Sequence, residues 1–191
     1  PAFELAYWSW GLKKANDWRE RMGRERNADW DRMADQMAPW PVVNGVYVEA
    51  ESVLEKDGGH PTQLAAYGFL PASAYLDKEV MRKTLRHVLD NWDWADTWGW
   101  DFPLIAMTAI RLNEPEWALE TLLKSVQKNT YLPNGHNFQN EGLPLYLPGN
   151  GGLLTVVAMM CAGWDGCTEG NPGFPKNGLW NVKWEGLKPA F

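Results

Sequence analysis

The chain has 191 residues, of which 45% are hydrophobic and 22% charged, a balance typical of a globular protein with an apolar core. A net charge of −6 and the lack of a basic run interleaved with aromatic residues argue against a nucleic-acid partner. The longest apolar run, residues 153–163, is too short to span a bilayer, so the sequence predicts no membrane segment. Thirteen tryptophans are many for this length and indicate flat apolar faces offered to a ligand.

Apolar residues recur every three or four positions along most of the chain, which predicts helices. In chain order, the predicted helices span residues 3–22, 29–37, 61–70, 77–89, 102–112, 116–127 and 152–163. Asp77 is expected to cap the helix that follows it. The stretch Asn113–Glu116 resembles a capping box with a proline in the first turn. Asn44-Gly45 lies in a non-helical stretch and indicates a small β-hairpin.

The predicted helices alternate in character. Three are apolar on every side and should be buried, at 61–70, 102–112 and 152–163. Three others carry one apolar stripe and one charged face and should lie outside, at 29–37, 77–89 and 116–127. An inner helix followed by an outer helix, repeated, predicts an all-α fold. We expect a two-layer α/α toroid with about three and a half helical hairpins in residues 1–170, and a tail at 171–191 that leads out of the barrel.

Long connections join each outer helix to the next inner one, at 38–60, 90–101 and 128–151, whereas the inner-to-outer links are short. Loops of this length usually carry function. In a toroid all three long connections would fall on one rim, above the amino ends of the inner helices. The unpaired N–H groups at such ends favour anionic and oxygen-rich ligands.

These long connections are rich in carboxylates, amides, imidazoles and aromatic rings. Carboxylates and amides suit the hydroxyls of a sugar, and aromatic rings suit its C–H faces, so the composition favours a carbohydrate site. Peptide or polyol pockets could use the same residue types. The candidate substrate-binding residues are Glu51, His60, Trp98, Trp100, His136, Asn137, Gln139 and Asn150.

The stretch NWDWADTWGWD, residues 91–101, allows three interpretations: a core patch, a metal loop or a sugar-binding rim. Its first two tryptophans end an outer helix, which favours packing. Trp98 and Trp100 flank the start of an inner helix, which favours ligand contact. The three aspartates lack the regular Asp-Gly pattern of calcium loops, so we expect no metal and no cofactor.

Two candidate residues and the two cysteines keep structural alternatives open. Asp101 and Asn150 each stand at the start of a predicted helix and could be N-caps. Cys161 and Cys167 lie six positions apart across a glycine-containing turn, which leaves a disulfide open without implying one.

Four segments in order resemble the six-hairpin, (α/α)6-barrel glycoside hydrolases, most of all the fucosidase-type family 95 and the family-65 phosphorylases and hydrolases. HPTQLAAYGFLP at 60–71 is similar to the family's H-x-x-L-x-x-x-x-P helix entry, and 97–123 is similar to its T-G-W-x-x-A-W segment and the helix pair that follows. YLPNGHNFQ with LPGNGGLLTVVAMM is similar to the L-x-N-L…F-Q…D-G-N-F-G-G entry, and LWNVKWEGLKP at 179–189 is similar to the segment running into a β-domain. The resemblance implies the carboxy-terminal half of a catalytic domain.

The resemblance also implies hydrolysis of a glycosidic bond in an oligo- or polysaccharide, commonly with inversion. In the family the general acid is a glutamate upstream of the helix that begins here at Phe3, so a segment before residue 1 is expected to supply it. Pro148 stands where the family has an aspartate, while Asn150 keeps the family's asparagine. Asp101 and Glu141 are therefore the candidate catalytic residues that activate water.

Two other functions also fit the residue types. A polysaccharide lyase would use Tyr131, Tyr146 or His136 as its base, and a non-catalytic carbohydrate-binding toroid would fit the loss of the aspartate at Pro148. The expected partners are a carbohydrate and the missing amino-terminal half of the protein or another chain, which would cover the apolar flanks of the inner helices. A periplasmic or secreted location is expected if the full-length chain carries a signal peptide.

Overall fold

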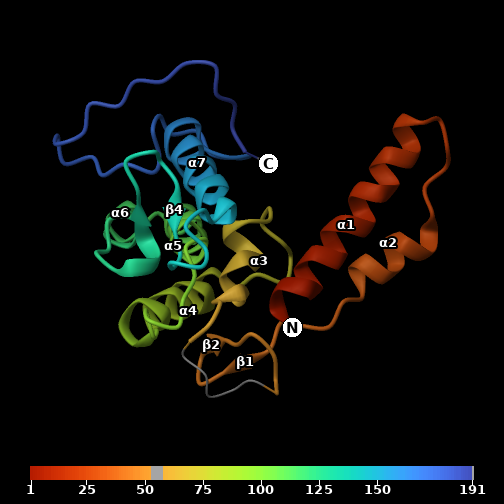
Figure 1. The fold of residues 1–191 in the computed structure, drawn as a ribbon. Coiled ribbons are helices and arrows are strands. Elements are labelled where there is room, and N and C mark those ends of the chain that lie inside the picture. The colour runs from red at the N-terminus through yellow and green to blue at the C-terminus, as the bar shows by residue number, and fades with distance from the viewer. Residues whose placement is uncertain (53–57, 191) are drawn as a thin grey trace.

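The computed structural model describes residues 1–52 and 58–190 and is mostly helical (Figure 1). In these described ranges, four short strands form two separate hairpins. The elements are α1 (Ala2–Arg21), α2 (Ala28–Asp35), β1 (Val42–Val43), β2 (Val46–Tyr47), the 3-10 helix η1 (Thr62–Leu64), α3 (Ala65–Gly68), α4 (Lys78–Asn91), α5 (Asp101–Arg111), α6 (Pro115–Leu122), the 3-10 helix η2 (Gln127–Asn129), β3 (Thr130–Tyr131), β4 (Asn137–Phe138) and α7 (Leu147–Ala162).

Local sequence signals explain several boundaries. The Asp77 side chain accepts hydrogen bonds from two backbone N–H groups in the first turn of α4, so the predicted cap is confirmed. The predicted hairpin at Asn44-Gly45 is also confirmed: Val42 pairs with Tyr47 and Val43 with Val46. Both turn residues take positive φ values, 51° and 80°, which asparagine and glycine tolerate best.

Four predictions about these helices are wrong. The segment 61–70 is split into η1 and the short α3, and the helix expected at 116–127 ends at Leu122. The expected capping box does not form. Asn113 has a positive φ of 63°, and the N-cap position of α6 is Glu114, whose side chain makes no capping hydrogen bond. The last helix, α7, begins at Leu147 rather than 152, since Pro148 is compatible with a first helical turn.

Helix α5 is the centre of the fold. Every residue from Asp101 to Arg111 is buried, as predicted for this segment. Helices α1, α3, α5 and α7 pack against one another in that order, while α2 packs on α1, α6 on α5, and α4 on α5, η1 and β2. The chain therefore alternates between a row of helices, α1, α3, α5 and α7, and helices that pack on members of that row.

The two ends of this row expose apolar side chains. The prediction that the last helix is buried on every side is wrong, because α7 packs on α5 through one face and leaves Leu154 73% exposed on another. Leu147 and Val157 are also exposed on α7. Helix α1 lies at the other end of the row, and its Trp8 and Trp18 side chains are 61% and 60% exposed.

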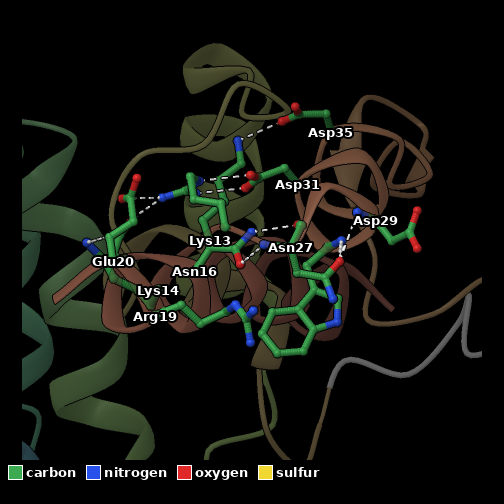
Figure 2. Close-up of polar contacts among 12 residues, drawn as sticks. Lys13, Lys14, Asn16, Arg19, Glu20, Asn27, Asp29, Asp31 and Asp35 are labelled. Carbon is green, nitrogen blue, oxygen red and sulfur yellow. Dashed lines mark hydrogen bonds and ion pairs between the residues drawn. The ribbon is translucent and has the colours of Figure 1, made fainter. Parts of the chain in front are cut away.

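A polar network fixes the α1–α2 hairpin, which extends away from the other helices (Figure 1). Figure 2 shows Asn16 and Asn27, which exchange two hydrogen bonds of 2.9 and 2.8 Å. Next to them the Arg26 guanidinium donates two bonds to the Asp31 carboxylate, at 2.8 and 2.9 Å. These bonds lower the pKa of Asp31 to about 2. The hairpin is therefore held by directed hydrogen bonds where apolar contact is scarce.

The contact between α3 and α5 at Gly68 gives a stability test. A Cβ at Gly68 on α3 would lie 2.9 Å from the Thr108 backbone nitrogen and 3.2 Å from the Leu104 carbonyl of α5. We expect Gly68→Ala to lower the free energy of unfolding by about 1–3 kcal/mol, measured by urea denaturation. Gly11→Ala is the matched control, since nothing lies within 4 Å of its Cβ position in α1. The control should gain about 0.5–1 kcal/mol from reduced backbone entropy. A neutral Gly68→Ala would contradict the close α3–α5 contact.

Candidate functional site

A buried carboxylate lies where the second long connection meets α5. Asp101 is fully buried (0% exposed) and accepts three hydrogen bonds. The donors are the Thr97 hydroxyl at 2.7 Å, the Trp98 backbone N–H at 2.8 Å and His60 Nδ1 at 3.0 Å. The N-cap interpretation of Asp101 is wrong, because the cap position is Trp100 and has no side-chain bond. Its carboxylate instead joins the connection 92–100 to His60.

Burial raises the pKa of Asp101, and the hydrogen bonds from Thr97 and Trp98, together with the nearby His60, only partly offset this effect. An ionised carboxylate can accept hydrogen bonds but cannot donate them. When Asp101 is ionised, His60 donates to it through Nδ1, and a neutral His60 ring then has its lone pair on Nε2. The His60 side chain is 38% exposed, so this nitrogen belongs to a ring that solvent reaches.

Aromatic rings surround His60. The ring centroids of His60 and Trp100 lie 5.1 Å apart, those of His60 and Trp98 lie 6.0 Å apart, and those of Trp98 and Tyr146 lie 5.4 Å apart. All four rings are partly buried and come from the three long connections. We call His60, Trp98, Trp100 and Tyr146 the aromatic mouth. The Lys128 ammonium lies 5.4 Å from the centroid of Trp98, which adds a cation at its edge.

A cavity of about 300 Å³ adjoins the aromatic mouth and shares Trp100 with it. Its walls are mainly apolar side chains of the helix row, among them Phe3, Leu104 and Met107, with Pro148 and Thr155 contributed by α7. The aromatic mouth therefore combines a polar nitrogen, flat rings and an adjoining apolar wall, which is the usual make-up of a small-ligand site.

Asn137 and Gln139 were expected to bind substrate, but both are fully buried. Asn137 Nδ2 donates to the carbonyls of Lys128 and Thr130, each at 3.2 Å. Gln139 Oε1 accepts from the Gly99 backbone N–H at 2.9 Å. Neither amide reaches solvent, so we infer that both act by positioning the third connection against the loop that carries Trp98 and Trp100.

Asn150 has a similar bracing contact pattern. Its Oδ1 accepts from the Asn137 backbone N–H at 3.0 Å, and its Nδ2 donates to the Gly135 carbonyl at 2.7 Å. The N-cap interpretation of Asn150 is wrong, because α7 begins at Leu147 and Asn150 already lies inside its first turn. Asn150 instead ties that turn to the third connection.

The remaining candidates lie apart from the Asp101–His60 pair in their contacts. Glu51 and Glu141 are exposed, and Glu141 lies in the turn closed by the bridge between Asn140 and Leu143. His136 is partly buried and adjoins the turn at Asn134 through its backbone. Within residues 1–52 and 58–190, no hydrogen bond or ion pair joins these three side chains to Asp101 or His60.

The other tryptophans of the 91–101 stretch belong to the core or pack against it. Trp92 is buried and its indole N–H donates to the Gly59 carbonyl at 3.3 Å, while Trp94 stacks on Phe102 with centroids 5.7 Å apart. The structure thus divides the stretch between core and aromatic mouth. Across the described residues, no group of three or more His, Cys, Asp or Glu side chains is placed to hold a metal ion. Cys161 and Cys167 are both free thiols.

Comparison with known proteins adds no further assignment. No model of a protein family matches the sequence, and no curated relative matches it. In the part of the chain that the structure describes, no helix has both the length and the hydropathy needed to cross a bilayer. The chemistry of the aromatic mouth is therefore the basis for assigning a function.

Two contributors were missed at the sequence level, Thr97 and Lys128. Thr97 stands four residues before Asp101, a spacing that lets the hydroxyl reach the carboxylate at a helix start. This spacing can be read from the sequence of residues 91–101. Lys128 offered none, because it stands next to Trp98 only through the fold of the third connection.

The hydrogen-bond pattern predicts the protonation state of one ring nitrogen. In the ¹⁵N NMR spectrum of the neutral ring, His60 should be protonated at Nδ1 and unprotonated at Nε2. In Asp101→Asn the amide oxygen would keep the bonds from Thr97 and Trp98, so its NH₂ would face His60 and move the ring proton to Nε2. His136 serves as the internal control and should not change. An Nε2-protonated His60 in the unsubstituted protein would refute the pairing.

Proposed function

We propose that this chain belongs to a glycoside hydrolase that acts on an oligo- or polysaccharide. The observation that carries the proposal is the Asp101–His60 pair beside three aromatic rings. Trp98 and Trp100 would stack on the C–H faces of a sugar, and Nε2 of the partly exposed His60 ring would accept a proton from a hydroxyl or a water. The order of the four family-like segments supports the same reaction class.

In this proposal His60 takes the role that the sequence suggested for Asp101 or Glu141. Asp101 is a positioning residue, because its oxygens are bonded inside the protein and reach substrate only through His60. Inverting hydrolysis needs a base that activates water and an acid that protonates the leaving oxygen. His60 would be the base, and the acid would come from a segment preceding residue 1, as the family resemblance implies.

The arrangement of helices supports a finer fold proposal. The row α1, α3, α5 and α7, with α2, α4 and α6 packed on it, supports the proposal of inner and outer layers that form part of an (α/α)6 toroid. The exposed apolar side chains of α1 and α7 lie at the two ends of that row. We propose that further helices, from the same protein or from another chain, cover these ends and complete the ring.

A polysaccharide lyase is the second candidate, favoured by Tyr146 in the aromatic mouth and by Lys128 at its edge. The Lys128 ammonium could neutralise a uronate carboxylate, and Tyr146 or His60 could then remove the proton next to it. A lyase product carries a new C=C bond and absorbs in the ultraviolet, whereas a hydrolase product does not. A non-catalytic glycan-binding toroid would bind sugar at the same rings without releasing any product.

Substitution of the proposed base tests the catalytic assignment. In the full-length enzyme, His60→Gln and Asp101→Asn should each lower the rate of reducing-end release from a polysaccharide panel by about 10²–10⁴-fold. Glu141→Gln is the matched control and should stay within a few-fold of the unsubstituted enzyme, because Glu141 is exposed and not bonded to the pair. Near-normal turnover in His60→Gln, or a large loss in Glu141→Gln, would overturn the assignment.

Stacking on the aromatic mouth is tested by binding alone. Trp100→Ala should weaken the affinity for an oligosaccharide that the protein binds by about tenfold, the size expected for one lost aromatic contact. Trp18→Ala is the control, since Trp18 is exposed on α1 and belongs to a different face. Isothermal titration calorimetry would measure both, and equal affinities for Trp100→Ala and the unsubstituted protein would exclude this ring as a platform.

A further inference from the structure

Residues from all four helices of the row line the cavity of about 300 Å³ beside the aromatic mouth. On α5 and at its N-cap they are Trp100, Leu104 and Met107, whose spacing of four and three positions places them on one face of the helix. On α7 they include Gly151 and Thr155, again four positions apart. The cavity is therefore a space between helices, and it begins at one ring of the aromatic mouth.

This cavity offers a ligand few hydrogen-bond partners. Apart from the Trp100 indole, the polar side chains among its described lining residues are Thr62 and Thr155. The Thr155 hydroxyl donates to the Gly151 carbonyl at 2.8 Å, so its proton is already used. A sugar ring placed here would lose hydrogen bonds to water without regaining them from the protein, which is unfavourable. The lining therefore favours an apolar group rather than the sugar itself.

The size of the cavity sets the size of that group. An apolar cavity of about 150 Å³ is enough to hold benzene, so about 300 Å³ accommodates a substituted ring or a short alkyl chain. A Cβ at Gly151 would meet no atom within 4 Å, whereas one at Gly152 would lie 2.6 Å from the Pro103 ring of α5. Gly152 is thus needed where α7 packs on α5, while Gly151 leaves its side of the cavity open.

We propose that this cavity binds the apolar aglycone of an aryl or alkyl glycoside whose sugar lies on the aromatic mouth. The inference rests on the proposed glycoside hydrolase function and names its substrate class. Trp100 joins the two spaces, because it lines the cavity and its ring centroid lies 5.1 Å from that of His60. A glycoside that crosses this indole keeps its hydroxyls beside His60 and removes its aglycone from water, so both parts contribute to affinity.

A dye that carries no sugar tests the cavity alone, in the full-length enzyme. N-phenyl-1-naphthylamine, which is neutral and fluoresces when it leaves water, should bind, and n-hexanol should displace it. Gly151→Leu places a side chain in the open side of the cavity and should weaken dye binding by about tenfold or more. Gly11→Leu is the matched control, since it adds the same side chain to open space on α1 and should leave dye binding unchanged. Absence of dye binding, which a covering helix in the cavity would cause, or undiminished binding by Gly151→Leu, would overturn the proposal.

An alkyl series tests the substrate class without a substitution. Isothermal titration calorimetry would compare methyl, butyl and hexyl glycosides of glucose, galactose, xylose and fucose in both anomeric forms. For a sugar that binds, affinity should rise about threefold with each added CH₂. Methyl glycoside binding with no gain from longer chains would overturn the cavity assignment and leave the proposed function standing. Binding of the dye and n-hexanol with no gain from any sugar would contradict the proposed function, and with it the glycoside substrate class.

Discussion

The bond between the buried Asp101 carboxylate and His60 is the interaction on which the site depends. Asp101 is the first residue of the central helix, and His60 ends the long connection that precedes η1. The same carboxylate takes bonds from Thr97 and from the Trp98 backbone, so it also fixes the loop that carries two tryptophans. A single buried acceptor thus holds two connections in register, and the aromatic mouth follows from that placement.

The positions of the helices were largely predictable, because the spacing of apolar residues indicates which helix faces are buried. Helix α5 is apolar throughout and is buried throughout, as expected. Helix α7 is also apolar, yet its Leu154 is exposed. An apolar composition indicates that a helix face needs covering, but it does not show whether residues 1–191 provide the cover. The predictions of helix ends were wrong where a single turn sets the end. At Pro148, α7 begins five residues before the start that the glycines suggested.

The grouping of several site residues was predictable, but the contacts that each of them makes were not. His60, Trp98 and Trp100 were expected on one rim. The ring centroids of Trp98 and Trp100 each lie within about 6 Å of the His60 ring centroid. Asn137 and Gln139 were expected there too, and they are buried braces. An amide in a loop has the same sequence signature whether it faces a ligand or a backbone carbonyl, and only the fold of the third connection separates the two.

The most direct test of this account is a double-mutant cycle on the free energy of unfolding, with His60→Ala, Asp101→Asn and the combined variant. A hydrogen bond to a buried charge should appear as a coupling free energy of about 1–3 kcal/mol between the two positions. The combined variant would then be destabilised by clearly less than the sum of the single variants. Strictly additive losses would show that the two side chains act independently, and the Asp101–His60 pair would no longer explain how the aromatic mouth is held.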